Sequence, residues 1–292
     1  MGDFVLCNCN KEEVSTKMGF SCLPVSLYKQ FYAGRLSIPQ WSVLGQELGL
    51  NAIDINALFM DDMSLGNVEA VRKELMLPVL MVSAYSDFTT TDHTQRNQQL
   101  ETALDNIRKS QAIGAAYIRL TAGPAYPDCK VHRTIDNVYR CFEVCVAEAQ
   151  RCGIMVLLEN HSQPASWAYP DFNFHPTRVL RLWEKLQSLP IGVNFDVANA
   201  YALGNWQEIL QVMSGRIETV HINDLACVDP LSFCIVGEGV VCIETMLRAI
   251  YATGFSGWMS VEEAGNQGLE GMAKAIANFR KLYAAAIQQD ET

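Results

Sequence analysis

Four short apolar segments each end in a side chain that can bind a metal ion or move a proton. MVLLE ends in Glu159, GVNFD in Asp196, TVH in His221 and WMSVE in Glu262. Consecutive members of this set are separated by about one strand–loop–helix unit. If the segments are neighbouring parallel strands, the side chains at their carboxyl ends converge. Three carboxylates and one imidazole then predict a site for Mn²⁺, Mg²⁺ or Co²⁺, with Zn²⁺ also compatible.

Each of these residues has a simpler interpretation when it is taken alone. Glu159 could be solvated or paired with an arginine, Asp196 could cap a helix, and His221 could be a hydrogen-bonded core histidine. Glu262 is followed by Glu263, and side-chain alternation lets only one of the two continue the strand toward the site. We favour the metal site because all four residues fall at equivalent positions in consecutive units.

The rest of the sequence alternates between strand-like and helix-like segments. The predicted strands cover residues 18–27, 52–59, 78–85, 117–122, 154–159, 191–196, 219–222 and 258–262. The predicted helices cover residues 38–48, 68–75, 94–113, 133–151, 176–186, 206–213, 243–252 and 269–287. Several helices stop at a glycine just before the next strand, at Gly49, Gly114, Gly153 and Gly254, where a left-handed cap is expected.

This alternation predicts the α/β class, and within it a single (β/α)₈ TIM barrel. The strands are continuous apolar runs, as expected when both faces of a sheet are covered. A doubly wound open sheet is the alternative, but the sequence has no GxGxxG or Walker motif. We expect one domain over residues 1–292, with residues 1–17 as a peripheral N-terminal extension.

The composition narrows the class of partner. The net charge is −10 and the 22 Lys and Arg residues are scattered, which argues against nucleic acid. No apolar stretch is long enough to span a membrane. The ten cysteines form no CxxC pair, and the first residues do not resemble a signal peptide, so we expect reduced thiols and a cytoplasmic location. A homo-oligomer is compatible with the sequence.

Five segments resemble a known family. They are LLENH (157–161), NFDVANAYALG (194–204), VHIND (220–224), GEGVV (237–241) and GFSGWMSVEE (254–263). They are similar to the sugar phosphate isomerase/epimerase family, which shares a xylose isomerase-like TIM barrel. Its members include ketose 3-epimerases, hydroxypyruvate isomerases and inosose dehydratases.

The resemblance implies that Glu159, Asp196, His221 and Glu262 bind the metal and that Glu159 and Glu262 are also catalytic. The expected function is a divalent-metal-dependent isomerase or epimerase of a sugar or sugar phosphate, acting by α-proton abstraction through a metal-bound cis-enediolate. A metal-dependent dehydratase of the inosose or dehydroshikimate type and a non-catalytic metabolite-binding barrel are the alternatives. The expected partner is a small sugar or polyol-derived molecule.

Two positions depart from the family pattern. Asn199 stands where the epimerases carry histidine, and Asn223 stands where many members carry lysine. No arginine shortly after His221 matches the one that ketose 3-epimerases use. These departures leave the substrate open without affecting the metal site.

Further polar residues are expected to contact the substrate, namely His161, Asn199, Arg119, Asp224 and Tyr85. Arg119 could clamp a phosphate or carboxylate, or it could pair with a barrel acid such as Asp54. Asp224 could orient the imidazole of His221 or cap a turn. Trp167 and Tyr169 are consistent with either a lid that stacks on a sugar or ordinary loop packing.

Overall fold

Eight parallel strands form one sheet at the centre of the molecule. The computed structural model describes residues 19–164 and 166–287, so the predicted extension over residues 1–17 lies outside the described residues. The strand order is β1-β10-β7-β6-β5-β4-β3-β2, with every adjacent pair parallel. The strands are β1 (Phe20–Leu23), β2 (Ile53–Asn56), β3 (Val79–Ser83), β4 (Tyr117–Leu120), β5 (Met155–Glu159), β6 (Gly192–Asp196), β7 (Ile217–Ile222) and β10 (Trp258–Glu262).

The first and last strands of this order, β1 and β2, lie next to each other, so that the sheet is nearly closed. The backbone N–H of Asn51 donates to the carbonyl of Phe20 at 2.9 Å, and the N–H of Phe20 donates to the side-chain oxygen of Asn51 at 2.9 Å. Between the strands, the Ser21 hydroxyl donates to Asp54 at 3.2 Å. The prediction of a (β/α)₈ TIM barrel is therefore confirmed.

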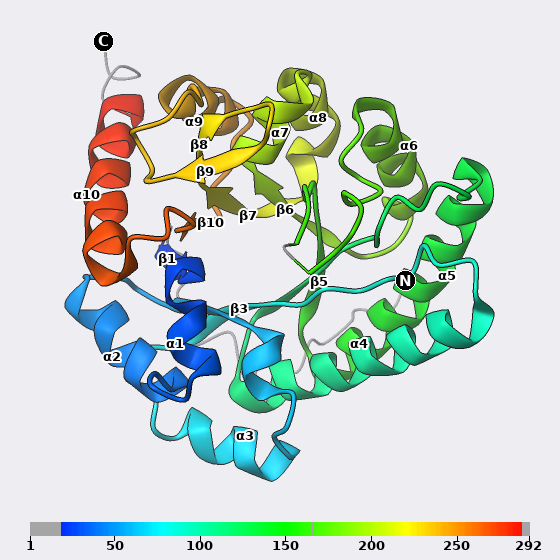
Figure 1. The fold of residues 1–292 in the computed structure, drawn as a ribbon, viewed down its shortest axis with the longest axis horizontal. Helices are drawn as coiled ribbons and strands as arrows, with labels where there is room; N and C mark the ends of the chain where they lie inside the picture. The colour runs from blue at the N-terminus through cyan, green and yellow to red at the C-terminus, as the bar shows by residue number, and fades with distance from the viewer. Residues whose placement is uncertain (1–18, 165, 288–292) are drawn as a thin grey trace, which may run out of the picture.

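Helices surround the strands (Figure 1). The longer ones are α2 (Ile38–Glu47), α3 (Leu65–Arg72), α4 (His93–Ile113), α5 (Val131–Cys152), α6 (Pro176–Leu186), α8 (Trp206–Met213), α9 (Ile243–Ala252) and α10 (Gly268–Ile287). Helices α4 and α5 end at Gly114 and Gly153, whose φ angles of 84° and 71° confirm the expected left-handed caps. No helix within the described ranges is long and apolar enough to cross a membrane.

The first two predicted strands extend well beyond the strands that form. Within the described residues 19–27 of the first, only β1 is strand, because Pro24 follows and the chain turns into the 3₁₀ helix η1 (Val25–Leu27). The second ends at Asn56, whose side chain accepts the N–H of Leu58 and starts the 3₁₀ helix η2 (Ala57–Met60).

Several short elements were not predicted. They are α1 (Tyr28–Tyr32), α7 (Val197–Leu203), the 3₁₀ helix η3 (Ser214–Arg216), and an antiparallel hairpin of β8 (Asp224–Cys227) and β9 (Ser232–Cys234). The hairpin, yellow in Figure 1, follows β7 directly and extends the loop beyond the end of that strand. All of these insertions lie between a barrel strand and the next long helix, apart from η3, which precedes β7.

The barrel interior becomes more polar toward the carboxyl ends of the strands. A small separate apolar cluster near the strand starts consists of Ala52, Leu80, Met81, Leu157 and Trp258. Further along, Asn194, Thr219 and Ser260 precede Asp196, His221 and Glu262 by two residues, so alternation places them on the same face. Thr219 donates to Asn194 at 2.7 Å. The strands thus carry an inner polar layer just below the predicted site.

Candidate metal centre

The four residues singled out in the sequence come together at the ends of four neighbouring strands. Glu159 on β5, Asp196 on β6, His221 on β7 and Glu262 on β10 each offer one ligand atom, and these atoms all lie within 4.8 Å of one another. Nδ1 of His221 lies 3.2 Å from Oε1 of Glu159 and 3.0 Å from Oε2 of Glu262. We call Glu159, Asp196, His221 and Glu262 the four-residue cluster.

The spacing of the four-residue cluster suits a small divalent ion. Opposite ligands of an octahedral ion with bonds of about 2.1 Å are about 4 Å apart. Three of the four side chains are completely buried, and that of Glu262 is 14% exposed. The open side of such a site is therefore next to Glu262.

The charges of the cluster also favour a cation. Burial, together with repulsion from Glu159 and Glu262, raises the pKa of Asp196 well above its ordinary value. Burial opposes a charge on His221, but the two glutamates outweigh it and raise the pKa of the imidazole well above its ordinary value. Three carboxyl groups thus surround one imidazole ring, that of His221, which carries a proton. A divalent ion would replace that proton and neutralise the carboxylates more completely.

Glu159 differs from the other acids because an arginine is buried beside it. Nε of Arg119 lies 2.7 Å from Oε2 of Glu159, and both side chains are completely buried. Burial alone would raise the pKa of Glu159, but the charges of Arg119 and His221 lower it to about 2. Arg119 therefore pairs with an acid, but the acid is Glu159 rather than Asp54. Its Cζ also lies 5.0 Å from the centre of the Tyr85 ring.

Two asparagines hold the cluster in place. Asn160 bridges β5 and β6, because its side chain donates to the carbonyl of Asp196 and accepts the N–H of Asp196, both at 2.8 Å. Nδ2 of Asn223 donates to Oδ2 of Asp196 at 2.8 Å and lies 3.5 Å from Oε2 of Glu262. Sequence reasoning missed Asn160, although a buried amide directly after an expected ligand is a usable signal. Asn223, noted only as a departure from the family, contacts two members of the cluster.

Asp224 does not orient the imidazole of His221. Its carboxylate accepts four backbone N–H groups, from Leu225, Gly237, Gly239 and Val241, at 2.8–3.1 Å. The second of the two interpretations, capping of a turn, is the correct one. Gly237 has a φ of 85°, and a Cβ at Gly239 would overlap Oδ1 of Asp224, which explains the GEG sequence. Asp224 thus organises the loop after β7, and its role as a substrate contact stays a prediction.

Asp54 is a buried acid on β2, near enough to His221 for the charge of the imidazole to affect its pKa. Its Oδ2 accepts the hydroxyls of Ser21 and Ser260. Burial raises the pKa of Asp54 to about 6, while the charge of His221 acts in the opposite direction. Oδ1 of Asp54 and Nε2 of His221 are buried and have no hydrogen-bond partner among the described residues. An acid inside the apolar strand IDIN was the sequence signal for this position.

The three remaining candidates for substrate contact lie at the same end of the barrel. Asn199 donates its backbone N–H to Oδ1 of Asp196 at 2.6 Å, and its own Oδ1 is buried without a hydrogen-bond partner among the described residues. The ring of His161 lies 5.6 Å from the ring of Tyr85. Nδ1 of His161 is 3.9 Å from Oδ2 of Asp171, too far for a hydrogen bond. Asn199 and His161 therefore keep polar atoms available to a ligand.

We expect His161 to stay neutral down to about pH 5 in the metal-free protein. Burial is the main cause that lowers the pKa of its ring from 6.5 to about 4. The unfolded chain binds this proton at higher pH than the folded one. The contribution of the neutral His161 ring to the free energy of unfolding is therefore complete above pH 6.5 and is lost as the pH falls toward 4. A histidine nitrogen–proton NMR titration measures this, with the His161→Gln variant to assign the signal. A ring that titrates near 6.5 would contradict the prediction.

A family model described as "Xylose isomerase-like TIM barrel" matches residues 44–282 of the chain. This range contains the four-residue cluster and seven of the eight barrel strands, all except β1. The sequence has no significant match among curated proteins.

Three solved structures illustrate the range of similar proteins. An L-ribulose 3-epimerase has a TM-score of 0.75 and 13% identity, covering 94% of this chain and 97% of the epimerase. The IolI protein "with a binding zinc atom" has a TM-score of 0.75 and 16% identity, covering 93% and 99%. A probable 3-DHS dehydratase from Bacillus anthracis has a TM-score of 0.68 and 15% identity, covering 91% and 98%. At these identities the similarity establishes the fold and leaves the reaction to the site residues.

Proposed function

The chain belongs to the xylose isomerase-like TIM barrel family, and on that premise we propose that it is a divalent-metal-dependent sugar isomerase or epimerase. The reaction starts with removal of the proton on the carbon next to a carbonyl group. The small-molecule substrate is a sugar or a polyol-derived ketone. The four-residue cluster holds the ion, and Glu159 and Glu262 are also the proton-transfer groups.

One observation carries this proposal. Of the four neighbouring strands that hold the cluster, the two outer ones each end in a glutamate. Glu159 comes from β5 and Glu262 from β10, with β6 and β7 between them. Their carboxylates lie 3.2 and 3.0 Å from the same nitrogen of His221. Two carboxylates that reach one point from different strands can remove a proton from a carbon and return it from another direction.

The two glutamates have different environments, and the difference suggests which proton transfer each of them performs. Glu159 is completely buried beside Arg119, and its pKa of about 2 keeps it ionised and weakly basic. Glu262 is partly exposed on the open side of the site, and it has no arginine partner among the described residues. We therefore assign removal of the α-proton to Glu262. Glu159 is ionised at the start, so it takes up a proton from solvent before it returns one to the carbon.

The donor set fits a hard or borderline ion. Glu159, Asp196, His221 and Glu262 would hold it through three oxygens and one nitrogen, which suits Mn²⁺, Mg²⁺ or Co²⁺ and is compatible with Zn²⁺. When bound, the ion supplies positive charge next to the substrate oxygen that becomes negative during proton removal. Asn160 and Asn223 keep the ligand-bearing strands in register while this happens.

We expect solvent deuterium to enter the carbon next to the carbonyl when the protein is incubated with its substrate in D₂O. A panel of ketoses, aldoses and inososes is tested with Mn²⁺, Mg²⁺, Co²⁺ or Zn²⁺, and exchange is followed by NMR. Chelation should stop the exchange and re-addition of the ion should restore it. Elemental analysis should find about one ion per chain in the active sample.

Three outcomes would contradict the proposal in different ways. A protein that takes up no stoichiometric ion has no metal centre. A product with the absorbance of a new enone indicates a dehydratase, which removes the same proton but expels a hydroxyl group. Stoichiometric metal and ligand binding without exchange from any substrate indicates a metabolite-binding barrel.

A further inference from the structure

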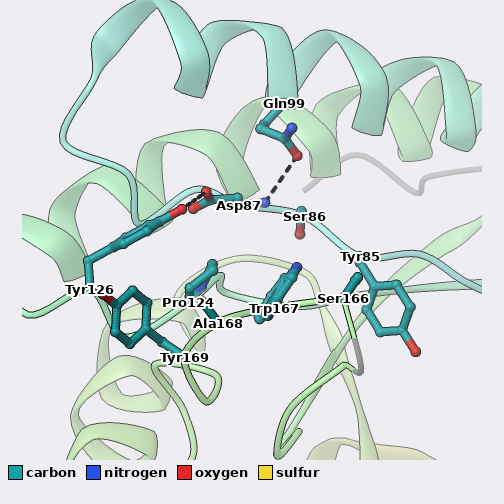
Figure 2. Close-up of a pocket in the computed structure, with 10 residues that line it drawn as sticks. All are labelled: Tyr85, Ser86, Asp87, Gln99, Pro124, Tyr126, Ser166, Trp167, Ala168 and Tyr169. Atoms are coloured by element: carbon teal, nitrogen blue, oxygen red, sulfur yellow. Dashed lines mark hydrogen bonds between the residues drawn. The ribbon is translucent and has the colours of Figure 1, made fainter.

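A cavity of about 270 Å³ opens at the end of the barrel that carries the four-residue cluster. It lies among the loops that follow β3, β4 and β5, and Figure 2 shows its lining. The Pro124 and Trp167 side chains lie between Tyr85 on one side and Tyr126 and Tyr169 on the other. Its volume is close to the lower end of the range for ligand pockets, so it has room for one small ring.

The lining combines aromatic faces with uncharged polar groups. Tyr85, Tyr126, Trp167 and Tyr169 supply four aromatic rings. The ring of Trp167 is 6.2 Å from that of Tyr85, and the rings of Tyr126 and Tyr169 are 5.9 Å apart. Aromatic faces pack against the C–H faces of a sugar ring, while nearby hydroxyl and amide groups bind its hydroxyls.

The one acidic residue in the lining is already engaged by the protein. Asp87 accepts the Tyr126 hydroxyl at 2.6 Å, the Thr89 hydroxyl at 3.0 Å and the N–H of Thr90 at 3.1 Å. Gln99 accepts the N–H of Asp87 through its Oε1, which leaves the Gln99 amide N–H₂ for a ligand. None of the described lining residues is a lysine or arginine, so the cavity is unsuited to a phosphate or carboxylate.

Tyr85 connects this cavity to the metal centre. Its ring lines the cavity, and it also lies 5.6 Å from the ring of His161 and 5.0 Å from Cζ of Arg119. Arg119 in turn contacts Glu159. In Figure 2 the Tyr85 hydroxyl points away from Trp167. Tyr85 is therefore a residue that the cavity and the surroundings of the metal centre share.

We propose that the substrate is a glycoside, with a sugar unit that carries the reacting carbonyl group at the metal centre and a second, uncharged sugar ring stacked in the cavity formed by Tyr85, Tyr126, Trp167 and Tyr169. This inference rests on the proposed function, because it assigns the substrate class of the same site. It also gives Trp167 and Tyr169 the sugar-stacking role that was one of their two interpretations. A free monosaccharide would leave the cavity unfilled, and a phosphate group would meet no positive charge there.

Binding tests the cavity independently of turnover. Tryptophan fluorescence of the metal-free full-length protein is titrated with a neutral disaccharide, its monosaccharide, an aryl glycoside and a sugar phosphate. Only ligands with a second ring should change the emission, and the Trp167→Phe variant should lose that change. Trp206→Ala removes a partly buried tryptophan on α8, outside the cavity, and should retain it.

Turnover tests the same inference at the metal centre. In the loaded enzyme, Trp167→Ala should lower the ratio of kcat/KM for the two-ring substrate to that for the one-ring substrate by about tenfold, and Trp206→Ala should leave the ratio unchanged. Equal loss for both substrates, or a preference for the sugar phosphate, would overturn the inference. A preference for an aryl glycoside that keeps the same carbonyl-bearing sugar unit over the disaccharide would replace the second sugar by an aromatic group and also overturn it. Binding of two-ring ligands without any proton exchange would support the cavity as the site of a second sugar ring, and it would contradict only the proposed function.

Discussion

Glu262→Gln is expected to reduce the rate of α-proton exchange by at least about 10³-fold, because the amide cannot accept the proton that the carboxylate removes. The substitution keeps an oxygen in place as a neutral ligand, so part of the metal affinity should survive. The measurement is single-turnover exchange in D₂O at saturating ion, with the metal content determined on the same sample. A loss of rate at full metal occupancy assigns the effect to proton transfer rather than to loss of the ion.

Glu263→Gln is the matched control for this variant. Glu263 is the next residue along the chain and accepts the N–H of Gly265 at 2.8 Å, a role that the glutamine oxygen can retain. We expect it to exchange protons at close to the rate of the unmodified protein. If both glutamine variants lose the same activity, or if Glu262→Gln keeps it, then Glu262 is not the base. If neither the variant nor the parent turns over but both bind ligand equally, the protein is a binding module.

The residues of the metal centre were predictable from the sequence because they depend on local rules. A parallel barrel brings the carboxyl ends of its strands to one face, so residues that close consecutive strands must meet. Strand alternation allowed only one of Glu262 and Glu263 to face the site, and the family resemblance indicated Glu262. The structure places Glu262 in the cluster, and Glu263 accepts the N–H of Gly265 in the loop that follows.

The partners of the other polar residues depend on contacts between distant parts of the chain. Asp54 binds hydroxyls that are 33 and 206 residues away in the sequence, and Asp224 is held by a loop that begins 13 residues later. The sequence close to Asp54 or Asp224 does not specify which distant residues become its hydrogen-bond partners. The chain between β7 and α9 contains the hairpin β8–β9, and only its folded path brings the GEG loop back to Asp224.

Arg119 is an intermediate case, since its partner follows from strand order. Strand β4 pairs with β5 so that Arg119 lies opposite Leu157, and Glu159, two residues further on, faces the same side. Asp54 lies on β2, two strands away from β4 in the sheet. A residue on β4 therefore pairs more readily with an acid on the adjacent strand β5, which is Glu159. The prediction that named Asp54 did not take this strand order into account.

Arg119→Met is expected to destabilise the metal-free protein by about 3–5 kcal/mol, because it leaves the carboxylate of Glu159 buried without its cation. The effect should depend on pH. The pKa of Glu159 in the folded protein, about 2, is below its ordinary value of 4.5, so the pair stabilises the protein above about pH 4.5. That contribution is lost as the pH falls toward 2, and the gap between variant and parent should narrow over the same interval.

Urea unfolding at pH 7 and at lower pH, with and without saturating Mn²⁺, measures both effects. The double variant Arg119→Met/Glu159→Gln is the control, because it removes the unpaired charge as well as the arginine. We expect it to recover most of the lost free energy of unfolding, as groups in direct contact are not additive. Bound Mn²⁺ should also reduce the loss in the single variant, since the ion supplies the positive charge that Arg119 no longer provides. If the single and double variants are equally unstable, Arg119 acts through packing alone. Its contact with Glu159 then contributes nothing to the charge balance of the metal centre.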